Sequence, residues 1–243
     1  KKSEHRKWGP KKENKGMRSG LHYLVEFLVI LLGITVSVTI EKNNAREYKR
    51  DVKDQGLKRI LANLQQDSLD MEYNIDVHLV SGASCQWMYD TRAVMSEQNP
   101  DTVGRNCAIC IQGQTIFVDN QEEYQTLQNS GLLEFIENDK LARALQGKYA
   151  QHDFIKKFEG YLIGFAERQY PTLFRCLSST PDIAFYKMTP LRRWNGAEFG
   201  QPFLEQTLEL ASMHEMYIGL MQERLAQDEQ LKAWIREEIG TRE

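Results

Sequence analysis

The sequence predicts a mainly α-helical fold with one N-terminal transmembrane helix. We expect that helix to continue into a long amphipathic helix, which packs with two further long helices as an antiparallel bundle. Three observations lead to this prediction. Residues 21–40 are almost uniformly apolar, three later stretches repeat apolar residues at helical spacing, and the first of these stretches has no proline from Val52 to Gln98.

The apolar segment, residues 21–40, contains one ionisable residue, Glu26, apart from His22 at its edge. As a helix it would be about 30 Å long, which matches the hydrocarbon thickness of a bilayer. A buried core helix seldom stays apolar all round for this length. A cleavable signal peptide is also disfavoured, because the apolar run is long for one and Thr39-Ile40-Glu41 is a poor cleavage site.

Basic residues flank the segment unequally. Residues 1–20 contain eight Lys or Arg against two acidic residues, whereas residues 41–55 contain five Lys or Arg. The more basic flank of a span usually stays in the cytoplasm. We therefore expect a cytoplasmic basic tail (1–20), a transmembrane helix (21–40) and a helical bundle domain (41–243) on the other side of the membrane.

The composition of the remaining chain is that of one globular domain. Apolar residues make up 41% of the sequence and charged residues 27%, which is not the composition of a disordered chain. Residues 41–243 carry 23 basic and 31 acidic residues. This acidic balance argues against nucleic acid as a partner, because sequence-independent binding needs a cationic face.

One face of the predicted span carries its unusual residues, Glu26, Ile30, Gly33 and Ser37. Small residues four apart allow a second helix to approach closely in lipid. Glu26 either pairs with a partner or reaches to the nearby headgroups. This face is the candidate association surface, with membrane lipid and either copies of the chain or other membrane-protein subunits as partners.

Two segments resemble an uncharacterised family of single-span bacterial inner-membrane proteins of the Bacteroidota type. The first runs from Tyr23 to Ile40 and is followed by Asn43-Asn44; the second runs from Glu123 to Leu141 and ends near Tyr149. This chain departs from the family pattern at Asn43, where a Trp is usual, and at Thr39, where Gln is frequent. The resemblance implies the single-span topology and a C-terminal helical domain of unknown function, and it implies no activity.

Beyond the membrane the pattern predicts helices separated by breaks. The long first helix should run to between residues 80 and 95 and be ended by Asn99-Pro100-Asp101, and residues 100–119 should form a small irregular or β-hairpin insert around Gln112-Gly113. The expected elements after that insert are a helix at 121–129 capped by Asn120, a helix from Asn138 or Asp139 that breaks at Tyr170-Pro171, a loop at 178–200, and a last helix that starts near Pro202.

Four cysteines, Cys85, Cys107, Cys110 and Cys176, are candidates for structural disulfides. A periplasmic domain would favour their oxidation. We expect Cys107 to pair with Cys110 and Cys85 with Cys176, by elimination only. Cys107-Ala-Ile-Cys110 also has the spacing of a thiol redox pair or part of a zinc site, but no βαβ pattern precedes it.

The sequence contains no recognisable catalytic motif. His78, His152 and His214 fall on the three long helices, and a bundle could gather them around a metal, but none has a typical ligand spacing. We therefore predict no catalytic, cofactor-binding or metal-binding residues. The leading hypothesis is a non-enzymatic, membrane-anchored scaffold or accessory subunit. The alternatives are an envelope sensor or adaptor that binds a ligand or partner through the helical domain, and a thiol redox enzyme.

Overall fold

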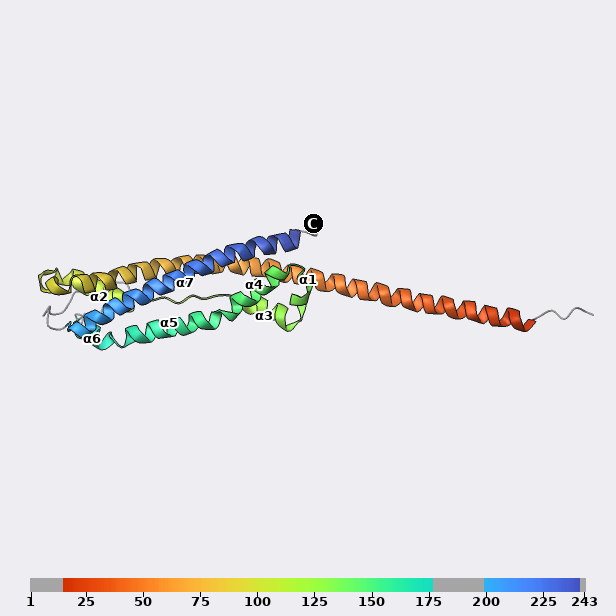
Figure 1. Cartoon of the computed structure of the whole chain (residues 1–243), viewed down its shortest axis with the longest axis horizontal. Helices are drawn as coiled ribbons and strands as arrows, with labels where there is room; N and C mark the ends of the chain where they lie inside the picture. The colour runs from red at the N-terminus through yellow and green to blue at the C-terminus, as the bar shows by residue number, and fades with distance from the viewer. Residues whose placement is uncertain (1–14, 177–198, 241–243) are drawn as a thin grey trace, which may run out of the picture. The chain divides into compact units, whose positions relative to one another are not determined.

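The computed structural model describes residues 15–176 and 199–240, without the side chains of residues 15–19, 21 and 174–176 (Figure 1). These residues are mainly helical, as predicted, and they contain no strand. Two compact units are present, Lys1–Asp51 and Val52–Glu243. The elements are α1 (Lys15–Asp90), a 3₁₀ helix (Arg92–Glu97), α2 (Pro100–Gln112), α3 (Glu122–Asn129), a second 3₁₀ helix (Leu132–Phe135), α4 (Asp139–Ala150), α5 (His152–Glu167), α6 (Tyr170–Cys176) and α7 (Gln201–Gly240).

The described part of the first unit consists of the start of α1. Its most apolar 18-residue window has a mean hydropathy of 2.3, and none of that window is buried. The hydroxyls of Thr35 and Thr39 donate to the carbonyls of Leu31 and Thr35, each at 2.8 Å. These bonds satisfy the hydroxyls within the helix. By length and composition, this helix can cross a membrane.

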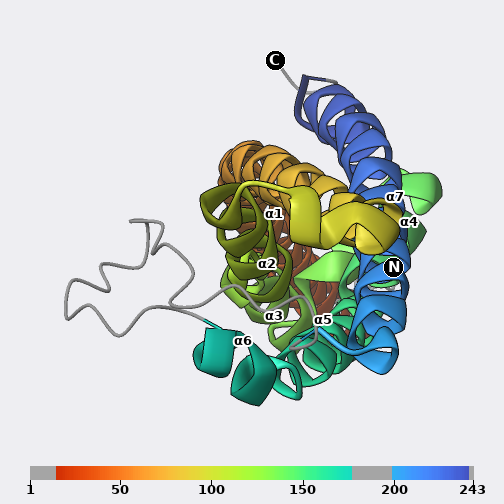
Figure 2. The same cartoon turned by 90° about the vertical axis from the view of Figure 1, so that its left-hand side faces the viewer.

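The second unit is a bundle built on α1 from residue 52 onward, α4 with α5, and α7. In Figure 1, α7 runs antiparallel to both of the other arms. The view along the bundle in Figure 2 shows α2 among α1, α5 and α7. The unit is held together by contacts between its helices. Helix α7 contacts α4 and α5, and α2 contacts α5, α6 and α7.

Two separate apolar clusters form the core of this bundle. One includes Met88, Phe117 and Met221, and the other includes Leu64 and Ile235. Along α7 the first cluster gives way to the second between residues 221 and 231, where Arg224 and Asp228 are both buried. A layer of charged groups therefore separates the two apolar clusters.

The prediction of a β-hairpin at 100–119 is wrong, because residues 100–112 form α2. The side chain of Asn99 accepts a hydrogen bond of 2.8 Å from the backbone N–H of Asp101, and Pro100 occupies the first helical position. Asn-Pro-Asp was interpreted as a helix stop, but the same residues are also a strong helix start. Residues 113–121 after it are irregular, as the other half of that prediction states.

Most other boundaries lie close to the predicted ones. Asn138 caps α4 by accepting from the N–H groups of Lys140 and Leu141. The cap before α3 is Gln121 rather than Asn120, and its side chain makes no capping bond. The expected single helix from 139 to 170 is two helices, α4 and α5, joined at Gln151. Of the predicted loop at 178–200, all but residues 199 and 200 lies outside the described part.

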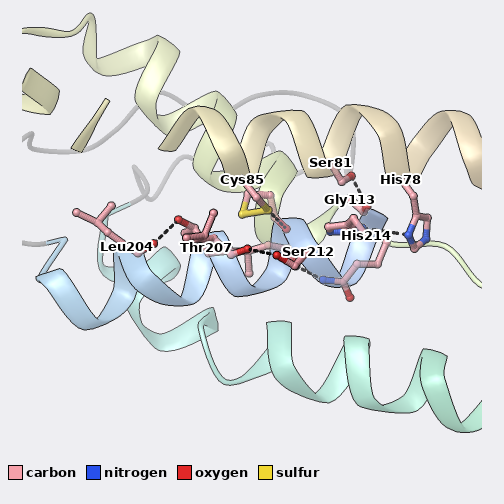
Figure 3. The surroundings of a disulfide bond; sticks show 12 residues. His78, Ser81, Cys85, Gly113, Leu204, Thr207, Ser212 and His214 are labelled. Atoms are coloured by element: carbon pink, nitrogen blue, oxygen red, sulfur yellow. Dashed lines mark hydrogen bonds between the residues drawn. A yellow bond between two sulfur atoms is a disulfide. The ribbon is translucent and has the colours of Figure 1, made fainter. Parts of the chain in front are cut away.

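The disulfide pairing differs from the expected one. Cys85 on α1 is bonded to Cys110 on α2, with their Cα atoms 4.7 Å apart (Figure 3). The pairings Cys107–Cys110 and Cys85–Cys176 are therefore both wrong. The physical reason is that Cys107 and Cys110 lie one turn apart on the buried face of a helix, so each contacts a different neighbour. The side chain of Cys176 lies outside the described residues.

Peptide mapping of the oxidised protein without reduction should recover a peptide containing Cys85 linked to one containing Cys110. Replacing Cys85 by Ser should release the Cys110 thiol for alkylation, and it should lower the free energy of unfolding by about 2–4 kcal/mol because the cross-link constrains the unfolded chain. A recovered link between Cys107 and Cys110 would contradict the fold around α2.

Candidate functional site

The candidate site is the polar interior of the bundle, which surrounds the extended segment 113–121. This segment lies within a helical domain and has no strand beside it in the described part of the chain. Its backbone N–H and C=O groups must therefore find other partners, because an unpaired buried backbone group is costly. Side chains from α1, α5 and α7 supply those partners.

The segment enters the bundle at Gly113. Its carbonyl accepts a hydrogen bond from the Ser81 hydroxyl on α1 (Figure 3). A Cβ atom at position 113 would collide with that hydroxyl and with the carbonyl oxygen of Ile109. Glycine is therefore required here by close packing.

The middle of the segment is held by a buried carboxylate and a phenol. The N–H of Phe117 donates to Glu159 Oε1 at 2.7 Å and to Tyr217 Oη at 3.1 Å, and Tyr217 itself donates to Glu159 Oε1 at 2.8 Å. Lys156 donates both to the Phe117 carbonyl and to Glu159 Oε2. Burial first, and then Glu159, raises the pKa of Tyr217 above its ordinary value.

The end of the segment is held by two aspartates of α1. Val118 N–H donates to Asp70 Oδ2 at 2.9 Å, and Asn120 donates its backbone and side-chain N–H groups to Asp67 Oδ1 at 3.2 and 3.0 Å. These contacts explain why polar residues occupy inward positions on an otherwise apolar helix face. The acidic residues of α1 act here as hydrogen-bond acceptors for a neighbouring segment.

Two of the three predicted histidines meet in the interior. His78 on α1 and His214 on α7 face each other with their Nδ1 atoms 3.0 Å apart (Figure 3), and His78 Nε2 is 3.1 Å from the Thr115 carbonyl oxygen. The backbone N–H of Thr115 also lies 3.4 Å from His78 Nε2, so both backbone groups of Thr115 face this ring nitrogen. The third, His152, lies 2.8 Å from Asp119 Oδ1.

Burial is the main reason that both interior histidines are neutral. It lowers the pKa of His78, and it lowers that of His214 to about 3, with a further decrease from His78 and a partial offset by the Cys110 carbonyl. A histidine pair with one carbonyl is not a metal centre by itself. Among the described residues, no group of three or more His, Cys, Asp or Glu side chains is arranged to hold a metal ion.

The charged layer between the apolar clusters centres on Lys148. Its Nζ lies 2.8 and 3.0 Å from the carboxylate oxygens of Asp228 and 3.5 Å from Asp67 Oδ2. Burial lowers the pKa of Lys148 and raises that of Asp67, while the attraction between them opposes both shifts. The buried Lys148 on α4 therefore links α1, through Asp67, to α7, through Asp228.

Arg224, on the same layer, is less well paired. Its Nη1 donates to Gln151 Oε1 at 3.3 Å, while Nε and Nη2 have no hydrogen-bond partner. It forms part of the wall of a pocket of about 200 Å³ at the junction of α4, α5 and α7. A second, shallower groove of about 670 Å³ lies between α1 and α7 near His78, with Gly82, Ala211 and Gly219 in its walls.

Sequence reasoning missed these buried charges. Lys148, Glu159, Arg224 and Asp228 were not singled out from the sequence, because charged side chains usually face solvent. A usable signal exists in α7, where Met221, Arg224, Asp228, Leu231 and Ile235 follow one another at helical spacing on a single buried face. A charged residue at an apolar-stripe position is the pattern that indicates a buried polar network.

The predicted association face lies in the first unit, apart from this interior network. The side chains of Glu26, Ile30, Gly33 and Ser37 are exposed there, and a Cβ atom added to Gly33 would meet no atom within 4 Å.

The histidine pair should make stability depend on pH. Above its ordinary pKa of 6.5 the unfolded-state histidine is neutral, as the folded one is, so its contribution to stability is complete. As the pH falls below that value, the unfolded chain binds protons that folded His214 does not, and stability is lost down to about pH 3. For His214 the loss between about pH 7 and pH 5 is roughly 2 kcal/mol.

Urea unfolding of the full chain in detergent at these two pH values measures this loss. The His214→Gln variant should show a smaller difference between them, by roughly 2 kcal/mol. An identical pH dependence in wild type and variant would mean that His214 is protonated in the folded state.

Comparisons of the chain with protein-family models, with curated proteins and with solved structures found no match. The chemistry of the described residues therefore carries the functional argument. Those residues give a helical bundle with a polar interior that includes buried ion pairs and an incompletely paired arginine, and an apolar first part of α1 that is suited to a membrane.

Proposed function

We propose that this protein is a non-enzymatic, membrane-anchored scaffold or accessory subunit. It associates with copies of itself or with other membrane-spanning chains through the face of Glu26, Ile30, Gly33 and Ser37. One observation carries the proposal: all the described side chains between residues 22 and 40 are exposed. Lipid can cover the apolar ones, but it offers nothing to a carboxylate.

The energetic argument centres on Glu26. A carboxylate facing lipid costs on the order of 2–3 kcal/mol at the centre of a span and less near the interface. A neighbouring helix with a donor would remove this cost. The open space at Gly33 allows such a helix to approach, since helix association in lipid depends on close van der Waals packing rather than on hydrophobicity.

The thiol redox alternative has less support. A redox pair would use Cys107 and Cys110 together, but Cys110 is joined to Cys85. All three cysteines have no solvent-exposed surface, whereas thiols that exchange need access. The sensor alternative gains a specific observation, the Arg224 pocket.

The orientation that we propose places the basic tail in the cytoplasm and Val52–Glu243 in the periplasm of a bacterial inner membrane. The unequal Lys and Arg counts beside the span support it. The resemblance to the single-span bacterial family supports the same topology. A disulfide between α1 and α2 also suits an oxidising compartment.

Replacing Gly33 by Ile should weaken association, because the added side chain fills the space through which a second helix approaches. Val29→Ile is the matched control, since it adds one methylene group elsewhere on the helix. Cross-linking in membranes, followed by native mass spectrometry in mild detergent, measures the associated fraction for each. Equal behaviour of the two variants, or a wild-type chain that is strictly monomeric with no co-purifying subunit, refutes the proposal.

Protease added to spheroplasts tests the orientation separately. With the domain outside, the protease should degrade the chain beyond Glu41 at its accessible sites and leave a protected fragment containing residues 1–40. A cytoplasmic control protein must remain intact in the same sample. Protection of the whole chain until the cells are lysed would reverse the assignment.

A further inference from the structure

A shallow groove of about 670 Å³ lies between α1 and α7 on the outside of the bundle. Four of the residues in its walls are small: Gly82 and Ala83 of α1, and Ala211 and Gly219 of α7. A Cβ atom added to Gly219 would meet no atom within 4 Å. The backbone of another chain can therefore approach α7 closely at this point.

The α1 wall of the groove belongs to a longer exposed stripe. Leu79, which is 51% exposed, and Ile218 of α7 are apolar residues of the groove itself. Residues about one helical turn apart continue the stripe in both directions. The exposed residues at this spacing are Glu72, Asp76, Leu79, Ala83, Gln86 and Asp90. The stripe is about 27 Å long, and its small and apolar middle has carboxylates on either side.

Both helices carry only acidic charges along this surface. Residues 60–91 contain five acidic residues and residues 199–223 contain four, and neither stretch contains Lys or Arg. Asp67 and Asp70 accept hydrogen bonds from the segment 113–121, whereas the other seven acidic side chains are exposed. One of the seven, Glu215, lies in the groove wall. The ion pairs of the described residues use other carboxylates.

The spread of these carboxylates limits what can occupy the groove. No group of three or more His, Cys, Asp or Glu in the described part of the chain is arranged to hold a metal ion. Arg92, the first cation beyond the α1 stripe, shares a separate pocket with Glu205. A second copy bound through the same face would bring like charges together, which is unfavourable. The surface instead matches an elongated partner with positive charges on both flanks.

We propose that the groove between α1 and α7 is a docking site for a cationic amphipathic helix of a partner protein. Small and apolar residues of that helix pack against Leu79, Ala83 and Gly219, in the way that amphipathic helices enter grooves of other domains. Its Lys and Arg side chains lie on both sides and reach Asp76 and Glu215. This site is separate from the association face in residues 21–40 and does not depend on it.

Fluorescence anisotropy of a labelled helical peptide tests the proposal. The probe has about four turns, with Ala and Leu on one face and Lys on both flanks. The full chain is held in nanodiscs of uncharged phosphatidylcholine, with empty nanodiscs as the blank. Wild type should bind the probe saturably and more weakly as salt is added. A peptide with Glu in place of Lys should not bind.

Two variants fill open glycine positions with the same side chain. Gly219→Leu places leucine in the groove and should weaken probe binding by about tenfold or more. The variant should fold, because the position is open and leucine is a better helix former than glycine. Gly160→Leu is the matched control, since Gly160 is an exposed and equally open position on α5. It should bind the probe as wild type does.

A second pair of variants tests the charges. Asp76→Asn combined with Glu215→Gln should weaken binding by about tenfold and reduce its salt dependence. Asp153→Asn combined with Glu167→Gln removes two exposed carboxylates from α5 and should leave binding unchanged.

Four results overturn the proposal: wild type without saturable binding, equal binding by Gly219→Leu and wild type, equal effects of the two charge variants, or binding of the Glu peptide. Native mass spectrometry of Gly219→Leu without the probe gives a fifth. A lower oligomer number than wild type would mean that a second copy occupies the groove. The Gly33→Ile variant should bind the probe normally, which separates this test from the association test.

Discussion

The structure depends on how one extended segment is accommodated inside a helical bundle. Residues 113–121 run between helices with no strand beside them in the described part of the chain; Phe117 in their middle is buried, whereas Ile116 and Val118 are exposed. Side chains from four helices form hydrogen bonds with those groups: Ser81, His78 and the two aspartates of α1, Tyr149 of α4, Lys156 and Glu159 of α5, and Tyr217 of α7. Each helix is thus fixed against the same strip of backbone. Replacing a side chain that is the sole partner of a buried peptide group leaves that group unpaired, which costs about 1–3 kcal/mol.

This arrangement explains why part of the fold was predictable and part was not. Helices with apolar residues at regular helical spacing, such as α7, and the cap at Asn138 follow from local rules that the sequence displays. Asn99-Pro100 was ambiguous because the same residues stop one helix and start the next. The pairing of Cys85 with Cys110 could not be predicted from the sequence. The two residues meet only after α2 folds against α1, and no local sequence pattern indicates that contact.

The polar interior was the least predictable part. The side chains that hold residues 113–121 come from positions far apart in the chain, such as Phe117 and Tyr217. Their types alone suit an exposed helix face equally well. Only their position in the helical repeat distinguishes buried charged residues from exposed ones, because Arg224 and Asp228 fall on the apolar stripe of α7. Buried charges of this kind add little net stability, because their desolvation offsets their attraction. They do penalise alternative packings of the three long helices, in which Lys148 would lose Asp228.

The end of α7 differs from most C-terminal helix ends. Glu238 accepts from Lys53 Nζ at 2.6 Å and from the backbone N–H groups of Glu137 and Asn138 at 2.9 and 3.0 Å. Burial alone would raise the pKa of Glu238, but these donors hold it below its ordinary value. The last turn of a terminal helix usually frays. Here one carboxylate fastens it to the first residues of the bundle and to the approach of α4, so fraying of this turn would loosen three parts of the domain at once. Loss of the turn of α7 that carries Glu238 would therefore disturb the start of the bundle and the approach to α4 as well as α7 itself.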